Sequence, residues 1–494
     1  MRRIGNAADL WQRLDTTRDK TAAFDRWLRS PWYIVTLAAL TAISSVLGLD
    51  LFLYSLIMFL GYYVCLCGSD LLPLVPMCIL CYVAPSRENN PGRYSKSIFY
   101  PLNGGIYLGV LLALLVGCLV WRLMKDPDLG GKKFLQTKRC LMPSMLFLGA
   151  SYLLSGMGVD EYFSIMGKNL VFALIQCFAV MALYWLFSGG IRWEKAPKDY
   201  LAWTGMMVGF VVLVQLLENY LSGRIFENGT LNRELIATGW GMHNNVGCMM
   251  AIGMPFAFYL ATTNKRGWIF NLLGTVLFLG TILSCSRGSI LMAAGAYCIC
   301  AFVVLKNPES RRQNLWVYLG TIVIVVAVVA LLAPKLLKVF RLFISQLDNV
   351  SQRDKLLNNG ISQFLTEPVF GGSFFPQGTY KPWDWAELDS FSSFFPPRWH
   401  NTLVQMFASC GTLGITAYLI HRWRTIQLFW HRRSVEHTFI AVSLAVLLCA
   451  ALLDCHFFNV GPVLFYSMAL AFAENLPEVK KTEKKPGKKM LQKQ

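Results

Sequence analysis

The sequence predicts an all-α, polytopic membrane protein, a transmembrane helical bundle of about 12–14 spans. Hydrophobic residues make up 55% of its 494 residues, charged residues make up only 15%, and the mean hydropathy is +0.45. A soluble chain of this length normally carries more charge, because its surface has to be solvated. Apolar runs of about 20 residues, the length that crosses a bilayer as a helix, recur along almost the whole chain.

The apolar runs give the order of the spans along the chain. The first three are short and crowded, so that about 12 spans is as consistent with the sequence as about 14. We expect the spans near residues 32–48, 50–67, 70–85, 100–124, 139–158, 169–190, 199–221, 244–263, 268–286, 289–305, 314–337, 400–420, 436–456 and 460–476.

The distribution of basic residues predicts the orientation. The net charge of +18 comes from 46 Lys and Arg against 28 Asp and Glu, and most of the excess lies in short segments between apolar runs. This is the positive-inside pattern of membrane proteins, so nucleic acid is not an expected partner. Only the loop 86–99 is basic on the wrong side. With the N-terminus in the cytoplasm, the basic loops on the inside are 125–139, 191–198, 264–266, 306–312 and 421–433.

Two long loops then lie outside, 222–243 and 338–399. The longer loop is too aromatic for a disordered linker, and long loops of this kind usually have a function. Its rings can form a carbohydrate-facing wall, since sugars stack on aromatic side chains; the alternative is an interfacial aromatic belt. The aromatic residues are Phe374, Phe375, Tyr380, Trp383, Trp385, Phe391, Phe394, Phe395 and Trp399.

Arg287 is the first candidate for chemistry on the outside. It lies in the run SCSRGS at 284–289, between two apolar spans with almost no loop. An arginine at this depth is costly unless it meets a partner or a water-filled cavity, which makes it a functional candidate. The alternative is an arginine that reaches toward the lipid headgroups at the outer interface.

Arg353 is the second candidate, in a segment that predicts a short amphipathic helix. Ser351 and Asp354 have the spacing of a capping box, and an apolar stripe at helical spacing runs to Leu365 before Pro368 ends the helix. Such a helix would lie on the outer membrane surface with Arg353 in its first turn. A helix N-terminus and a guanidinium together make an anion site; alternatively, Arg353 binds a neighbouring acid or a lipid phosphate.

His400 and Asn401 form the third candidate, at the outer mouth of a span. Histidine is the side chain whose ordinary pKa suits proton transfer near neutral pH. The alternative is an ordinary polar residue at the interface. His243 and His456 are also predicted outside, so topology alone does not select His400.

Four short motifs occur in the order typical of one family. They are GWGMHNNVGCMMAIGMPF at 239–256, Ser286-Arg287-Gly288, Arg353 with the Pro-x-x-Gly-Gly of 368–372, and His400-Asn401-x-Leu403 with Gly411-x-x-Gly414. Together they resemble the O-antigen ligase-related domain of the O-antigen ligase/O-antigen polymerase superfamily, which are bacterial polytopic membrane glycan transferases. The resemblance covers roughly residues 170–476.

The resemblance implies a function and roles for the candidates. It implies glycosyl transfer from an undecaprenyl-diphosphate-linked glycan to a saccharide or lipid-saccharide hydroxyl at the outer face of the cytoplasmic membrane, in surface polysaccharide assembly. Arg287 and Arg353 would bind the diphosphate, and His400 would take the proton of the acceptor hydroxyl. Arg233 and Asn401 are candidates for support. No metal or other cofactor is implied, because guanidinium groups can stabilise a leaving diphosphate.

We divide the chain accordingly into a cytoplasmic segment 1–31, N-terminal spans 32–165, an O-antigen ligase-like membrane domain 166–476 with the outer loop 338–399, and a basic cytoplasmic tail 477–494. One departure from the family pattern is His243-Asn244-Asn245, where a small residue or proline more often precedes the asparagine.

Two other classes of function are weighed against this one. A nucleotide-sugar transferase would use acidic metal ligands on the inside, and Asp126-Pro127-Asp128 has that spacing, although it lies among lysines. A transporter or flippase of lipid-linked glycans would also use membrane-embedded arginines. It should contain internal repeats or paired broken helices, and the sequence has no convincing repeat. Ligase and polymerase activity both remain open.

Overall fold

The structure, a computed structural model, describes residues 22–83, 102–126, 140–159, 162–227, 229–238, 241–308, 311–323, 326–327, 330, 350–375, 399–432 and 434–476. Helices dominate these residues, and four two-residue strands form two small hairpins, β1–β2 and β3–β4. In chain order the elements are α2 (Ala22–Leu28), α3 (Pro31–Leu47), α4 (Asp50–Cys67), α5 (Leu74–Val83), α6 (Leu102–Lys125), α8 (Met142–Leu153), α9 (Tyr162–Cys177), η2 (Phe178–Ala182), α10 (Leu183–Gly190), η3 (Trp193–Lys195), α11 (Tyr200–Leu221), β1 (Phe226–Glu227), β2 (Thr230–Leu231), η4 (Arg233–Leu235), β3 (Ala237–Thr238), β4 (Gly241–Met242), α12 (His243–Thr263), α13 (Gly267–Leu283), α14 (Arg287–Lys306), α16 (Val350–Thr366), α17 (Thr402–His431), α18 (Val435–Ala450), η8 (His456–Phe458) and α19 (Val460–Asn475).

The predicted fold class, a polytopic helical membrane bundle, is confirmed. In the described part of the chain, 7 helices are long and apolar enough to cross a membrane, and the pair α2–α3, bent by 68°, would make an eighth. Shorter apolar helices include α8, α13 and α18. Most predicted spans in the described part of the chain agree closely with the helices, because apolar runs in lipid must satisfy their backbone hydrogen bonds internally and therefore fold as helices. The predicted span 314–337 lies largely outside the described residues.

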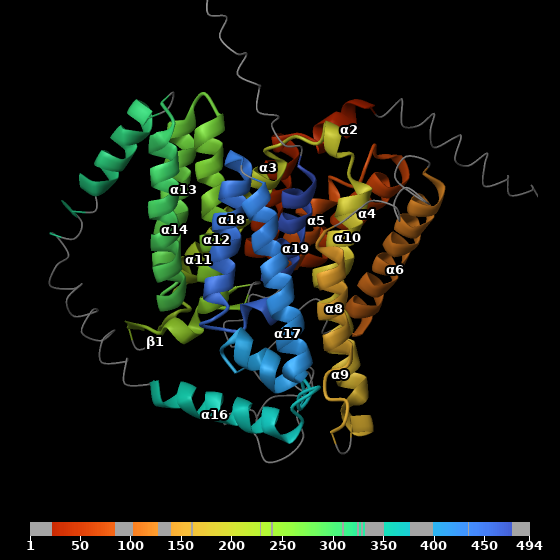
Figure 1. Cartoon of the computed structure of the whole chain (residues 1–494). Helices are drawn as coiled ribbons and strands as arrows, with labels where there is room; N and C mark the ends of the chain where they lie inside the picture. The colour runs from red at the N-terminus through yellow and green to blue at the C-terminus, as the bar shows by residue number, and fades with distance from the viewer. Residues whose placement is uncertain are drawn as a thin grey trace, which may run out of the picture.

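Helix α12 is the most enclosed of the described spans, with 89% of its apolar window buried. It packs against α11, α13, α14 and α18 (Figure 1). Its first residues lie at the same end of the bundle as Arg287 and His400, which we call the site end; the end that carries Lys306 and His437 is the opposite end. Figure 1 shows α16 lying across the site end.

Helix α17 is broken at Gly411, whose φ of 62° lies in the left-handed region that glycine adopts without steric cost. The turn that follows α16 fills the break: the Thr412 amide donates to the Pro368 carbonyl at 2.8 Å, and the Gly372 amide donates to the Ala408 carbonyl at 2.8 Å. These bonds replace the helical bonds that the break removes. They also fix the first part of α17, and hence the position of His400, relative to α16.

One predicted loop is wrong. Residues 421–433 were expected to form a basic cytoplasmic loop, but α17 continues to His431. The guanidinium carbon of Arg422 lies 4.3, 4.1 and 4.8 Å from the ring centroids of Tyr418, Phe457 and Tyr466. Cation–π contacts of this kind, with a 2.5 Å bond from Nη1 to the Tyr466 hydroxyl, let the helix carry a charge that the sequence pattern assigns to a loop.

Candidate functional site

The centre of the site is a pair formed by His400 and Asp454. His400 directly precedes α17, and Asp454 lies in the turn between α18 and η8. The imidazole Nδ1 lies 3.3 Å from the carboxylate Oδ1, and the side chains are 45% and 12% exposed. A mostly buried carboxylate therefore faces a partly exposed ring. His400 is a candidate from the sequence, whereas Asp454 is not among the candidates named there.

Asp454 is held as a carboxylate by its neighbours. Its Oδ2 accepts a hydrogen bond from Asn244 Nδ2 at 3.0 Å, and its Oδ1 accepts one from the Cys455 amide at 2.7 Å. Burial alone would raise the pKa of Asp454. The hydrogen bond to His400, the nearby charges of His456 and His400, and the Cys455 amide outweigh it and hold that pKa well below its usual range. Asp454 therefore carries a negative charge at neutral pH.

Asn244 connects this pair to the turn that carries Arg287. Its side-chain oxygen accepts a hydrogen bond from Ser286 Oγ at 3.0 Å, while its amide group donates to Asp454. Ser286 is also the N-cap of α14, where its hydroxyl accepts from the Ser289 amide. One asparagine thus links the start of α14 to the carboxylate that contacts His400.

Arg287 is the first residue of α14 and is half-buried at the site end. The turn around it packs tightly on the turn that carries Asp454, because a Cβ on Gly288 would lie only 2.8 Å from Leu453 Cδ1. Glycine at this position lets the two turns meet. Arg287 therefore lies next to the residues that hold the His400–Asp454 pair.

Asn401 holds the beginning of α17. Its side-chain oxygen accepts hydrogen bonds from the amides of Leu403 at 2.8 Å and Val404 at 3.3 Å, which is an N-cap. Its Nδ2 donates to the Leu452 carbonyl at 2.8 Å, and the Thr402 amide donates to the Ala451 carbonyl at 2.9 Å. These bonds fasten the start of α17 to the turn after α18 and so bring His400 to Asp454.

The backbone at the site is locally strained. His400 has a φ of 50° and Cys285, two residues before Arg287, has a φ of 57°. Residues other than glycine are uncommon in this region, although asparagine, aspartate and histidine occur there more often than the rest. Such backbone persists where the surroundings impose it, often at functional sites. Both motif turns therefore combine unusual backbone with the candidate residues.

Arg233 and His243 lie at the same end of the bundle, linked by Glu234. Arg233 Nε lies 3.0 Å from Glu234 Oε1, and His243 Nδ1 lies 3.8 Å from Glu234 Oε2. The side chain of Arg233 is 38% exposed, and its guanidinium contacts an acid. Its charge is therefore partly offset within the protein.

His456 is built into the core of the site end. Its Nδ1 lies 2.9 Å from Asn245 Oδ1, which also accepts a 2.6 Å hydrogen bond from Asn459 Nδ2. The ring is 3% exposed. Asn244 and Asn245 thus join α12 to the α18–α19 connection. In the sequence both lie within the motif at 239–256, at the point where His243-Asn244-Asn245 departs from the family pattern.

Arg353 lies in the first turn of α16, as the sequence predicts for its backbone; its side chain lies outside the described residues. The helix stands close to the site, because a Cβ on Gly360 would lie 2.6 Å from Val404 and 3.6 Å from Trp399. The apolar stripe of α16 is partly open, with Leu357 42%, Ile361 47% and Leu365 66% exposed.

The prediction that aromatic residues of the outer loop form a carbohydrate-facing wall is wrong for two of them. Phe374 is fully buried against Tyr152, Phe172 and Phe458, and Trp399 is 3% exposed. They pack the core because the turn after α16 is tied into α17. Tyr380, Trp383, Trp385, Phe391, Phe394 and Phe395 lie outside the described residues.

Asp126, weighed above as a metal ligand, pairs with Arg122. Its Oδ2 lies 3.1 Å from Arg122 Nη2, and both side chains are almost completely buried. Arg122 Nη1 also donates to the Val64 carbonyl at 2.9 Å. Asp126 therefore holds Arg122, and Arg122 fastens the end of α6 to α4. This buried ion pair disfavours a role for Asp126 as a metal ligand.

The comparison with known families agrees with the motifs. Residues 272–419 match the sequence model of the family described as O-Antigen ligase, a range that includes Arg287, Arg353 and His400. The match supports the O-antigen ligase superfamily, a family of membrane glycan-assembly enzymes. No curated protein sequence matches the chain. Asn244 and Asp454 lie outside the matched range.

Proposed function

With an O-antigen ligase domain at residues 272–419 as the premise, we propose that the protein is a glycosyltransferase that moves a glycan from undecaprenyl diphosphate to an acceptor hydroxyl. The observation that carries this proposal is the His400–Asp454 pair, linked through Asn244 to the turn of Arg287. A proton acceptor and a cationic residue next to one another are what this transfer needs.

The reaction is a single displacement. The acceptor oxygen attacks the anomeric carbon, a new C–O bond forms, and the bond from that carbon to the diphosphate oxygen breaks with its electron pair on the leaving group. The hydroxyl proton passes to His400. One displacement inverts the configuration at the anomeric carbon. General-base help of this kind contributes about 10²–10⁴-fold.

Asp454 acts through His400. Its carboxylate holds the ring at Nδ1, leaving Nε2 to face the acceptor, and its negative charge stabilises the imidazolium that forms during transfer. Because Asp454 is itself fixed by Asn244 and the Cys455 amide, the ring is oriented before the substrate arrives. Orientation of this kind lowers the cost of reaching the reactive geometry.

Arg287 and Arg353 bind the diphosphate and stabilise the charge that develops on it. The planar guanidinium fork matches phosphate oxygens in a bidentate way. Arg287 stands at a helix N-terminus, where the helix dipole adds to its positive charge. Arg233 supports the site more weakly because it is paired with Glu234.

The site end faces the outside of the cytoplasmic membrane. This orientation rests on the basic loops 191–198, 264–266 and 306–312, which all connect helices at the opposite end of the bundle. A polyprenyl-linked glycan presented in the outer leaflet would then meet the site directly. Ligase and polymerase differ only in the acceptor, a lipid-saccharide or another glycan unit.

The direct test incubates the purified protein with an undecaprenyl-diphosphate-linked glycan and a set of saccharide acceptors, with His400→Ala as the control. A new glycosidic linkage and released undecaprenyl diphosphate are expected for the wild-type protein alone. A transporter or flippase would leave every linkage unchanged and would move the glycan only between two compartments. That outcome would replace the proposed function by the alternative.

A further inference from the structure

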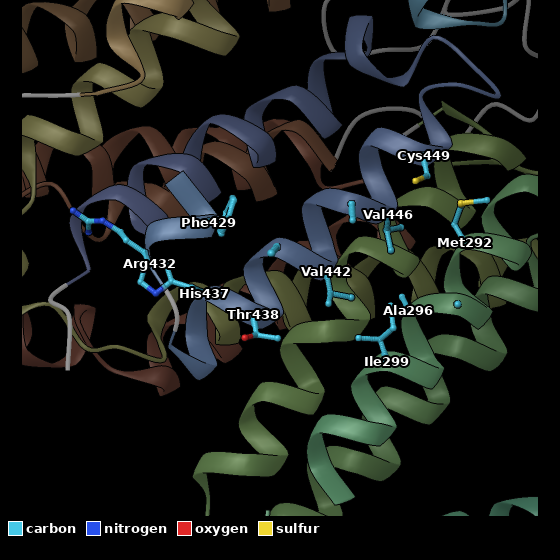
Figure 2. A pocket seen from close by; sticks show the side chains of 13 residues that line it. Met292, Ala296, Ile299, Phe429, Arg432, His437, Thr438, Val442, Val446 and Cys449 are labelled. Atoms are coloured by element: carbon cyan, nitrogen blue, oxygen red, sulfur yellow. The ribbon is translucent and has the colours of Figure 1, made fainter. Parts of the chain in front are cut away.

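Two arginines on α17 are held in different ways, and the first of them lies at the cavity between α14 and α18. This cavity, of about 590 Å³, is lined mostly by apolar and small side chains (Figure 2). The nitrogen-bearing side chains at it are bonded within the protein: Arg432 Nη1 donates to the Leu476 carbonyl at 3.3 Å, and His437 Nε2 lies 2.8 Å from the Ala473 carbonyl. Arg422, earlier on α17, lies away from this cavity and has other surroundings.

Arg422 lies within a membrane span and is enclosed by aromatic rings. Helix α17 is long and apolar enough to cross a membrane, and Arg422 lies about 14 Å before its end at His431. The guanidinium contacts the rings of Tyr418, Phe457 and Tyr466. Rings stabilise the faces of a guanidinium, whereas its N–H groups point outward in its plane and need hydrogen-bond acceptors.

The described part of the chain uses only part of this hydrogen-bonding capacity. Nη1 of Arg422 donates to the Tyr466 hydroxyl at 2.5 Å. That hydroxyl also lies 2.9 Å from His421 Nε2 and 3.3 Å from Thr425 Oγ1, which fills its own capacity. Nε and Nη2 of Arg422 are buried with no hydrogen-bond partner among the described residues. A guanidinium in a span without a compensating charge is costly and is a functional candidate.

Arg122 shows how a buried arginine is satisfied elsewhere in the same chain. Its Nη2 lies 3.1 Å from Asp126 Oδ2, and its Nη1 donates to the Val64 and Cys65 carbonyls at 2.9 and 3.2 Å. A carboxylate supplies the counter-charge, and main-chain carbonyls supply further acceptors. For Nε and Nη2 of Arg422, the described residues supply neither.

A second buried group without a partner lies on α8, which packs against α17. The Tyr152 hydroxyl is buried and has no hydrogen-bond partner among the described residues. Its ring packs against Phe458, 5.9 Å between centroids, and Phe458 follows the Phe457 ring that Arg422 covers. Guanidinium N–H groups and a hydroxyl O–H can all donate, so a ligand that only accepts hydrogen bonds suits them. A small anion does this and compensates the charge, whereas a water molecule would leave the charge uncompensated.

We propose that Arg422, together with Tyr152, binds a halide ion, which is chloride under ordinary conditions. A monatomic anion fits these packed surroundings best. The site is connected to the candidate active site, because Phe457 belongs to η8, which follows the turn of Asp454. A bound halide that compensates Arg422 therefore holds α17 against η8 and steadies this turn. The ion takes no part in the proposed transfer, so its binding does not depend on that function.

Binding of chloride to the wild-type protein is the first test. Radioactive chloride is dialysed against the purified protein, with sodium gluconate keeping the ionic strength constant. We expect saturable binding that bromide displaces and gluconate does not, and a thermal midpoint that rises as chloride replaces gluconate. No saturable binding would overturn the inference and leave Arg422 to water. Bromide located by its anomalous scattering in crystals should lie at the Arg422 guanidinium, and bromide found only elsewhere would also overturn it.

Matched variants assign the binding to these two side chains. Arg422→Gln removes the charge and should abolish saturable chloride binding, and Tyr152→Phe removes one donor and should weaken the affinity about tenfold. Tyr33→Phe, which removes a buried hydroxyl that donates to the Pro73 carbonyl at 3.1 Å, and Arg224→Gln, in the loop after α11, are the controls and should keep the wild-type affinity. Wild-type chloride affinity in Arg422→Gln or in Tyr152→Phe would contradict the site. If Arg422→Gln does not fold, Tyr152→Phe and the bromide position decide. Chloride bound at Arg422 in a protein that transfers no glycan would contradict only the proposed function.

Discussion

The imidazole Nδ1 of His400 lies 3.3 Å from Oδ1 of Asp454, although His400 lies just before α17 and Asp454 lies after α18. Hydrogen bonds from Asn401 to the Leu452 carbonyl and from Thr402 to the Ala451 carbonyl hold the two segments together. The pair is therefore a product of tertiary structure at the site end. Asp454 is therefore a second residue, besides His400, whose replacement should change the rate of the proposed reaction.

Asp454→Asn should lower kcat about 10²-fold and leave the KM for the lipid-linked donor nearly unchanged. Asparagine keeps the size of the side chain but removes the charge that stabilises the imidazolium, and the arginines still bind the donor. The measurement is the transfer rate against donor concentration. As a control, Asp199→Asn replaces an acid that accepts a hydrogen bond from Trp203 at the opposite end of the bundle, and its rate should equal that of the wild type. A wild-type kcat in Asp454→Asn would remove Asp454 from the mechanism.

His400 should be needed for the transfer step, whereas His243 and His456, the other two histidines predicted outside, should not. His400→Ala should lose about 10²-fold or more in rate and retain donor binding. Because His400 has a φ of 50°, His400→Asn is the better conformational match, since asparagine adopts this region more readily; it should lose as much. The rate and the donor affinity are measured at matched expression.

His456 and His243 serve as controls, and a different result is expected for each. His456→Ala should lower the thermal midpoint, because its ring bonds Asn245 in the core, and the rate per folded molecule should change little. His243→Ala should also cost far less rate than His400→Ala. Normal turnover in both His400 variants would leave the site without its base.

The helices could be predicted from the sequence because the bilayer imposes their length. An apolar run such as 199–221 has to form a helix that satisfies its own backbone, and α11 begins and ends within one residue of that range. The charge of Arg422 misled the interpretation of α17. Two of its three cation–π contacts come from Phe457 and Tyr466. These rings are far from Arg422 along the chain and give no local signal.

The candidate site could be predicted only in part. Arg287, Arg353 and His400 belong to short motifs with a fixed order, and the order is readable in the chain. Asp454 lies in the turn after α18 and Asn244 lies at the start of α12. Polar residues are common at such positions, and no periodicity distinguishes a partner from a solvated side chain. Their role depends on which turns meet, and that follows from the packing of α12, α14, α17 and α18.

Arg287 and Arg353 should be required as guanidinium groups. Lysine keeps the charge but lacks the planar fork that contacts two phosphate oxygens. We therefore expect Arg287→Lys and Arg353→Lys to lose about 10²-fold in transfer rate while membrane levels stay normal. Arg224→Lys, in the loop after α11, is the control and should keep its activity. Near-full turnover in both lysine variants would contradict the assignment of the diphosphate site.

The topology predicts which introduced cysteines a membrane-impermeant reagent can label. Cysteines at Glu227 and Asn232 should react from outside intact cells, and cysteines at Glu194 and Ser434 should react only after the membrane is opened. A cysteine at Thr425 should be protected from both sides, because α17 continues to His431 and Thr425 is 4% exposed. The reverse pattern at Asn232 and Glu194 would place the site in the cytoplasm.

The depressed pKa of Asp454 predicts how stability depends on pH. A carboxyl whose pKa is lower in the folded protein than in the unfolded chain, where it is about 3.9, stabilises the fold at every pH above that value. The contribution disappears as the pH falls from there through the folded-state pKa, which the His400 hydrogen bond and nearby positive charges hold well below the usual range despite burial. The thermal midpoint of the wild type in detergent should therefore exceed that of Asp454→Asn at about pH 5. Below about pH 4 the margin should shrink, because the unfolded chain takes up a proton that the folded carboxyl, with its lower pKa, does not. The same scan on Asp199→Asn supplies the baseline for acid effects elsewhere in the molecule. A margin that grew as the pH fell below about 4 would mean that Asp454 destabilises the fold as a charge, and the hydrogen-bonded pair with His400 could not then be the arrangement in solution.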